Sequence, residues 1–162
     1  MKVEQLMTHE VKVCTEADTL NRASQLMWES DCGCIPVIST NGDGRVVGIL
    51  TDRDIAMAAY TQGKQLWAIP VATAMARKVI SCHANDGITQ AEALMRDNRV
   101  RRLIVLDQNE CLVGILSLND VAREAQREAS TGRRVEVTGE GVSETLASIC
   151  QPHAPREMAV AA

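Results

Sequence analysis

The chain has 162 residues, a formal net charge of −4 at pH 7 and an aromatic content of 2%. This length predicts one compact module, and the acidic balance with so few stacking rings argues against nucleic-acid binding. No apolar run approaches the roughly 20 residues of a membrane-spanning helix, and the first residues are unlike a signal peptide. We therefore expect a cytoplasmic protein with neither a membrane nor a nucleic acid as partner.

One pattern occurs twice along the chain: a short strand, a helix, two strands joined by a turn, and a closing helix. In the first copy these elements are expected at residues 11–13, from 20 onward, 34–39, 45–50 and 52–61. In the second copy they are expected at residues 79–81, from 88 onward, 102–107, 111–116 and 118–128. Equivalent residues are 68 positions apart before the turn and 66 apart after it, because the second turn is shorter. One β-α-β-β-α unit is too small to bury its own apolar faces, so we expect the copies to pack on each other.

These copies divide the chain into four parts: repeat 1 (1–61), a linker (62–70), repeat 2 (71–128) and a C-terminal part (129–162). Apolar residues at helical spacing mark the first helix of each repeat: Leu20, Ala23, Leu26 and Met27, then Ile88, Ala91, Leu94 and Met95. Trp67 of the linker is expected to pack against the protein. In the C-terminal part we expect one short amphipathic helix, with Val142, Leu146 and Ile149 on one face, and a flexible tail from residue 151.

The six cysteines leave alternatives open. Cys14 and Cys82 are equivalent residues of the two copies and Cys111 lies in an apolar strand pattern, and we expect small buried side chains at all three. Cys32 and Cys34 form a Cys-x-Cys pair, but no second ligand pair stands at zinc-finger spacing, so no metal site is predicted. A redox-sensitive thiol at either position is the alternative. The three histidines are scattered and no nucleophile has a base beside it, so we assign no catalytic residue and expect no enzyme activity.

Each repeat closes with Gly-Ile-Leu, a hydroxyl residue and, three positions later, an aspartate: Thr51 and Asp54, then Ser117 and Asp120. The structural interpretation is a helix-capping box. Three features favour a ligand site: the motif recurs at equivalent positions, the acid is Asp rather than the longer Glu, and it follows the carboxyl end of a strand. A carboxylate there can accept hydrogen bonds from both hydroxyls of a ribose, and the adjacent helix N-terminus suits a phosphate.

In these residues the chain resembles a pair of cystathionine β-synthase (CBS) domains, over roughly residues 1–128. The motif Gly-x-x-[Thr/Ser]-x-x-Asp, present at 48–54 and 114–120 with the β-α-β-β-α order, carries the resemblance. It implies an α/β (α+β) fold whose repeats pack with pseudo-two-fold symmetry as a Bateman module, which commonly forms a homodimer. It also implies clefts between the repeats that bind AMP, ADP, ATP or S-adenosylmethionine.

The family's contacts can be carried onto this sequence residue by residue. The ribose contacts fall on Thr51, Asp54, Ser117 and Asp120. The adenine-contacting backbone falls on Val11, Lys12 and Val13 for the Asp120 cleft, and on Lys78, Val79 and Ile80 for the Asp54 cleft. Phosphate contacts fall on Arg53, Arg101 and Arg102. Because repeat 2 has Arg101 where repeat 1 has Gly33, we expect the clefts to differ in affinity, with the Asp120 cleft the tighter.

The resemblance implies a non-catalytic regulatory module that senses an adenosine-containing ligand and transmits occupancy to a dimer or to a protein target. The alternative is a structural or redox-sensitive interaction module that has lost ligand binding. The sequence names neither the ligand nor the regulated protein, since it contains no transporter, dehydrogenase or kinase domain.

Overall fold

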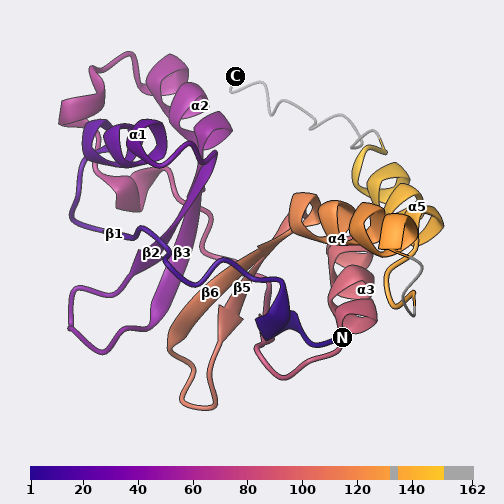
Figure 1. Ribbon diagram of the computed structural model, residues 1–162. Helices are drawn as coiled ribbons and strands as arrows, with labels where there is room; N and C mark the ends of the chain where they lie inside the picture. The colour runs from indigo at the N-terminus through magenta and orange to yellow at the C-terminus, as the bar shows by residue number, and fades with distance from the viewer. Residues whose placement is uncertain (132–134, 152–162) are drawn as a thin grey trace.

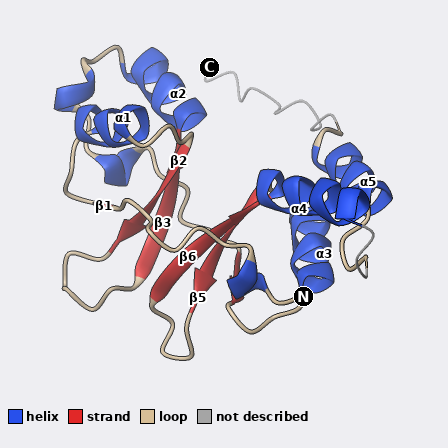
Figure 2. Cartoon of the chain, viewed as in Figure 1, coloured by secondary structure: helices blue, strands red, loops and turns tan. Residues whose placement is uncertain are grey.

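The computed structural model describes residues 1–131 and 135–151. It confirms the mixed α/β (α+β) fold, with one three-stranded sheet and its own helices in each repeat (Figure 1, Figure 2). Residues 132–134, in the C-terminal part before its expected helix, and residues 152–162 of the expected tail lie outside the described residues.

Each repeat contains the five expected elements in the expected order. Repeat 1 consists of β1 (Cys14–Thr15), α1 (Leu20–Glu29), β2 (Cys34–Ile38), β3 (Val46–Thr51) and α2 (Asp52–Gln62). Repeat 2 consists of β4 (Ser81–His83), α3 (Ile88–Asn98), β5 (Arg102–Leu106), β6 (Leu112–Ser117) and α4 (Leu118–Thr131). Three short 3-10 helices lie outside this pattern: η1 (Val3–Gln5), η2 (Leu66–Ala68) and η3 (Val71–Thr73). The C-terminal part adds α5 (Gly139–Ile149).

The two sheets have the same topology, in which the first strand is parallel to the second and the second is antiparallel to the third. The first strands begin later than expected, at Cys14 and at Ser81, so the prediction of a strand at 11–13 is wrong. Packing sets this register: Cys14 is buried beside Val37, whereas Val11 and Val13 are only half-buried. β propensity favours valine, but burial decides which residues pair.

The repeats exchange the segments that precede their first strands. Thr8 forms two backbone hydrogen bonds with Ile115 of β6, of 2.9 and 3.0 Å. Ala76 forms the equivalent pair with Ile49 of β3, both of 2.9 Å. Each segment therefore belongs to one repeat and pairs with the last strand of the other. This crossing places the residues that follow Thr8 beside the start of α4, where a site between the repeats can form.

Each repeat encloses its own apolar core, and the helical spacing read from the sequence is confirmed. Seven of the eight residues marked in the first helices are buried, and Leu94 is half-buried. Both cores also contain the cysteine of the first strand, Cys14 in one and Cys82 in the other. The prediction that Cys14 and Cys82 are small buried side chains is therefore confirmed.

The C-terminal helix α5 packs across α3 and α4 of repeat 2 (Figure 1). Val142 and Ile149 contact the core of that repeat, as expected. Leu146 does not, because its side chain is 46% exposed. Thr145 takes the buried position instead, and its hydroxyl accepts a hydrogen bond from Arg96 Nη1 of 3.0 Å.

Two side chains that the sequence assigned to the interior lie at the surface. Trp67 is 64% exposed, and its indole N–H donates to the neighbouring Gln65 side chain rather than packing on the protein. Cys111 is only half-buried, because it lies in the turn before β6 with its sulfur 3.6 Å from the carbonyl oxygen of Asp43.

Candidate functional site

The two hydroxyl–aspartate pairs have the same local geometry. In repeat 1, Asp54 Oδ2 accepts hydrogen bonds from Thr51 N (2.9 Å) and Thr51 Oγ1 (2.6 Å), while Asp54 N donates to Thr51 Oγ1 (3.2 Å). In repeat 2, Asp120 Oδ2 accepts from Ser117 N (2.9 Å) and Ser117 Oγ, and Asp120 N donates back to Ser117 Oγ (3.3 Å). The capping-box interpretation is therefore confirmed. In both boxes the aspartate accepts these bonds through Oδ2, so Oδ1 takes no part in the capping box.

A cavity of about 300 Å³, which we call the Asp120 cavity, lies between the two repeats. Ser117 and Asp120 line it from the end of β6 and the start of α4. Residues 10–12 line it from the exchanged segment, and Arg102 lines it from the start of β5. Repeat 1 contributes the loop that holds Gly33. This cavity thus gathers a carboxylate, a hydroxyl, an irregular backbone segment and cationic side chains around one space.

A smaller cavity of about 170 Å³, the Thr51 cavity, is the pseudo-symmetric counterpart. Thr51, Lys78, Ile80 and Arg101 line it at positions equivalent to Ser117, Glu10, Lys12 and Gly33 of the larger cavity. Cys34 and Arg102 are themselves equivalent residues, and they line both cavities. They therefore lie where the two cavities approach each other, and Arg102 borders both cavities.

Several residues that the sequence assigned to one of the clefts lie elsewhere in the structure. Arg101 lines the Thr51 cavity, so its charge does not favour the Asp120 cleft as the sequence comparison supposed. Arg53 lines neither cavity, because it lies exposed in the first turn of α2. Val13 and Val79 also lie outside both linings, and Asp54 reaches the Thr51 cavity only through its partner Thr51.

Among the lining residues of the Asp120 cavity that the sequence did not identify, Arg123 contacts the motif aspartate directly. Arg123, one turn along α4, lines the cavity and donates from Nη2 to Asp120 Oδ1. Its spacing of three residues from Asp120 on a helix is the signal that could have identified it. Asp120 is buried, whereas Arg123 is 75% exposed, so the arginine can leave the carboxylate without unpacking a core. Repeat 1 has Met57 at the equivalent position and so lacks this ion pair.

Gly33 owes its place in the Asp120 cavity to the absence of a side chain. A Cβ at this position would lie 3.1 Å from Asp52 Oδ2 and 3.5 Å from Arg102 Nη2. The Arg102 guanidinium, which comes from repeat 2, therefore reaches the space in front of Gly33. Repeat 1 lacks a cation of its own at this position, but the other repeat supplies one.

The buried thiols are poor nucleophiles. Burial, reinforced by the nearby acidic residues Asp18 and Asp86, raises the pKa of Cys14 to about 11 and that of Cys82 to about 12. Burial also raises the pKa of Cys34, although Arg102 opposes the shift. Since the thiolate is the reactive form, redox chemistry at Cys34 is disfavoured. Cys32 is half-buried and also lines the Asp120 cavity.

Among residues 1–131 and 135–151, no group of three or more His, Cys, Asp or Glu side chains is arranged to hold a metal ion. In the same part of the chain, no helix combines the length and the apolar character that crossing a membrane requires.

The comparisons with known proteins indicate one domain family. The model of the CBS domain matches residues 3–60 and 71–127. The CBS domain-containing protein YhcV of Bacillus subtilis is 35% identical over 130 residues, which cover 80% of this chain and 89% of YhcV. Among solved structures, the CBS domain protein TA0289 of Thermoplasma acidophilum is 22% identical with a TM-score of 0.75, covering 91% of this chain and 75% of that one. PAE2072 of Pyrobaculum aerophilum, solved as a complex with AMP, is 22% identical with a TM-score of 0.70, covering 81% and 99%. At this identity the two structures establish the fold.

Proposed function

The chain belongs to the CBS domain family, and we propose that it is a non-catalytic regulatory module that binds a phosphorylated adenosine in the Asp120 cavity. The Asp120 cavity supports this most directly, because one space holds a carboxylate–hydroxyl pair, exposed backbone and three cations. Its volume of about 300 Å³ lies at the lower end of the roughly 300–1,000 Å³ of small-molecule pockets. The AMP bound by PAE2072 belongs to the same ligand class.

Each part of such a ligand has a counterpart in the cavity. The ribose hydroxyls would donate to the carboxylate of Asp120, which has acceptor capacity beyond the bonds from Ser117. The adenine would lie against Val11 and Ile115, with the backbone of Glu10 and Lys12 beside its polar edge. Lys12, Arg102 and Arg123 would then face the phosphate. A phosphate can pair with these cations, whereas the sulfonium of S-adenosylmethionine cannot.

Arg123 provides a route by which ligand binding would change the structure outside the cavity. Without ligand it neutralises Asp120 through Oδ1. A ribose hydroxyl that takes Oδ1 would release Arg123 to a phosphate oxygen, exchanging one charge-assisted bond for another. The exchange would alter the first turn of α4 and the contacts between the repeats. A ligand shifts that arrangement only through its different affinity for the two states.

The Thr51 cavity would be the weaker site. At about 170 Å³ it is too small for a nucleotide without rearrangement, and Met57 stands where repeat 2 has Arg123.

Occupancy of the Asp120 cavity would be detected by a dimer partner or a protein target. All six cysteines are free thiols, which fits a reducing, cytoplasmic compartment.

Isothermal titration calorimetry on the intact protein tests this proposal. AMP, ADP, ATP, NAD(H) and S-adenosylmethionine would be titrated into the wild type, Asp120→Ala and Asp54→Ala. Both variants lose the aspartate of an equivalent capping box, so both should lose stability, by roughly 0.5–1.5 kcal/mol for each hydrogen bond removed. Only Asp120→Ala should lose the tight event, by at least tenfold, because charged hydrogen bonds contribute roughly 1.5–3 kcal/mol each. A wild type that binds no adenosine compound, or an equal loss in both variants, would refute the proposal.

A further inference from the structure

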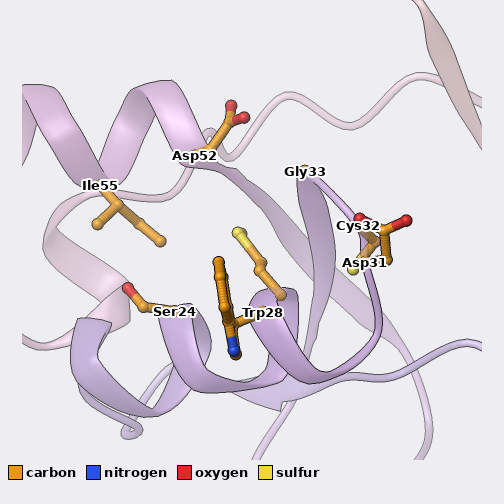
Figure 3. A pocket seen from close by; sticks show the side chains of 8 residues that line it. Ser24, Trp28, Asp31, Cys32, Gly33, Asp52 and Ile55 are labelled. Atoms are coloured by element: carbon orange, nitrogen blue, oxygen red, sulfur yellow. The ribbon is translucent and has the colours of Figure 1, made fainter.

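One short loop of repeat 1 forms part of the wall of two separate pockets. Asp31, Cys32 and Gly33, which we call the 31–33 loop, lie between the end of α1 and the start of β2 and line the Asp120 cavity. The same three residues line an open groove of about 420 Å³ between α1 and α2, which we call the Trp28 groove. Figure 3 shows Trp28 in this groove, with the 31–33 loop on one side and Ser24 on the other. A movement of the loop would therefore change both pockets.

Backbone hydrogen bonds tie the 31–33 loop to both helices that border the groove. At its beginning, Asp31 N donates to the carbonyl oxygen of Trp28 in the last turn of α1 (3.4 Å). At its end, the carbonyl oxygen of Gly33 accepts from the N–H of Asp52, the first residue of α2 (3.3 Å). Because the loop is bonded at both ends, its displacement would be passed to the end of α1 and the start of α2.

Two opposite charges approach the loop, one from each pocket. Asp52 lines the Trp28 groove, and Arg102 lines the Asp120 cavity. A Cβ on Gly33 would lie 3.1 Å from Asp52 Oδ2 and 3.5 Å from Arg102 Nη2, so the two side chains reach the same point beside the loop. A phosphate in the Asp120 cavity would draw the guanidinium of Arg102 toward itself. The charge that Asp52 faces across Gly33 would then change, although Asp52 does not line the cavity.

The equivalent loop of repeat 2, residues 99–101, is held by an additional contact. It has the same backbone bond to the closing helix, since Leu118 N donates to the carbonyl oxygen of Arg101 (2.9 Å). Helix α5 lies over α3 and α4, and Arg99 Nη2 donates to Gln151 Oε1 (3.3 Å) just beyond α5. Among the described residues, α1 and α2 carry no counterpart of α5. Of the two loops, the 31–33 loop therefore has the greater freedom to move.

We propose that the 31–33 loop couples the two pockets, so that a phosphorylated ligand in the Asp120 cavity changes the shape of the Trp28 groove. Arg102 responds to the phosphate, Asp52 responds to Arg102, and the loop carries the change to the ends of α1 and α2. This proposal rests on the proposed function, which supplies the ligand, and adds the segment through which occupancy reaches the surface of repeat 1. Trp28 lines the groove but not the cavity, so it reports on the ligand without touching it.

Fluorine NMR on the full chain labelled with fluorotryptophan tests the coupling, because Trp28 and Trp67 are the only tryptophans and each gives one signal. Trp28→Phe and Trp67→Phe assign the two signals. AMP should shift the Trp28 signal along the isotherm that calorimetry measures, and should leave in place the signal of Trp67, which lines neither the groove nor the cavity. Calorimetric binding with an unmoved Trp28 signal, or with equal shifts of both signals, would overturn the coupling and leave the proposed function standing.

Asp52→Ala separates the coupling from ligand binding. Because Asp52 does not line the Asp120 cavity, AMP should bind this variant with nearly wild-type affinity, whereas the shift of the Trp28 signal on binding should shrink to less than half. Glu29→Ala is the matched control, since it removes an exposed carboxylate next to Trp28 that lines neither the groove nor the cavity. The full shift should persist in Glu29→Ala, and a full shift in Asp52→Ala as well would overturn the proposed route.

A comparison without ligand tests the loop independently of AMP. Arg102→Met removes the cation that faces Asp52 across Gly33 and should shift the Trp28 signal of the free protein. Arg101→Met removes the neighbouring cation, which lines only the Thr51 cavity, and should leave the Trp28 signal in place. An unmoved Trp28 signal in Arg102→Met would overturn the coupling whether or not AMP binds. Absence of calorimetric binding together with a shifted signal in Arg102→Met would instead refute the ligand and support the loop.

Discussion

The two motif glycines offer a quantitative test of how the repeats cross. A Cβ at Gly114 would lie 2.7 Å from Met7 Sδ and 3.0 Å from the carbonyl oxygen of Thr8. A Cβ at Gly48 would lie 2.6 Å from Met75 Sδ and 3.1 Å from the carbonyl oxygen of Ala76. In each case the contact atoms belong to the exchanged segment of the other repeat. The sulfur can move, but the carbonyl is held by the backbone pairs to Ile115 and Ile49.

Gly114→Ala should therefore overpack a site that cannot relax fully, at a cost of about 1–3 kcal/mol. For a chain of this size such a loss lowers Tm by roughly 2–4 °C per kcal/mol, hence by about 2–12 °C. Differential scanning calorimetry and urea unfolding measure both quantities. Gly139→Ala is the matched control, because a Cβ there meets nothing within 4 Å and alanine is tolerated at the first position of a helix, so stability should not fall.

The paired variant separates the two cavities. Thr8 and Ile115 line the Asp120 cavity, whereas Ile49 lines the Thr51 cavity. Gly114→Ala should thus weaken nucleotide binding, while Gly48→Ala should lose similar stability and bind normally. Wild-type stability in Gly114→Ala would show that Met7 yields freely, which would refute the close packing of the exchanged segment.

Two further substitutions, at Glu92 and at Arg102, test the roles of individual charged residues. Burial raises the pKa of Glu92, against the opposing effect of Arg96, and Glu92 Oε1 has no hydrogen-bond partner among the described residues. The folded state therefore favours the protonated acid, so its stabilising contribution is complete below the ordinary value of 4.5 and is lost as the pH rises through the raised pKa. Glu92→Gln should abolish this loss and exceed the wild type in urea unfolding at pH 7 but not at pH 4; parallel pH curves would contradict it. Arg102→Met should weaken binding in both cavities, whereas Arg101→Met should affect only the Thr51 cavity, as calorimetry with AMP would show; a wild-type isotherm for Arg102→Met would exclude the shared guanidinium.

The fold could be predicted from the sequence because the duplicated pattern and the apolar periodicity indicate the same helices and strands. Helix α1 was read correctly from four apolar residues at helical spacing, since that spacing alone determines which face is buried. The short first strand was misplaced because two residues carry too little pattern to fix a register. Cys14 is buried through its tertiary contact with Val37, which local propensity does not contain.

The site was predictable as pairs of equivalent residues but not as clefts. Repeat alignment identifies Gly33 with Arg101, yet it cannot say which repeat's aspartate each one faces. That depends on how the copies cross, and the crossing places Arg101 in the Thr51 cavity. Arg123 was missed for a different reason. Its partner, Asp120, had been assigned to a ribose alone, although a helical spacing of three residues brings the two side chains together.

The differences between the repeats follow one direction. Where repeat 1 has Met57 and Trp28, repeat 2 has Arg123 and Arg96. Arg123 turns one capping box into a cavity with an exchangeable cation, and Arg96 anchors α5 over its own repeat. Repeat 1 has the smaller cavity and exposes the side chains of Trp28 and Met57. Divergence has thus placed a cation beside the capping-box aspartate of repeat 2 alone, and under the proposed function a ligand in the Asp120 cavity would contact both repeats through the exchanged segment.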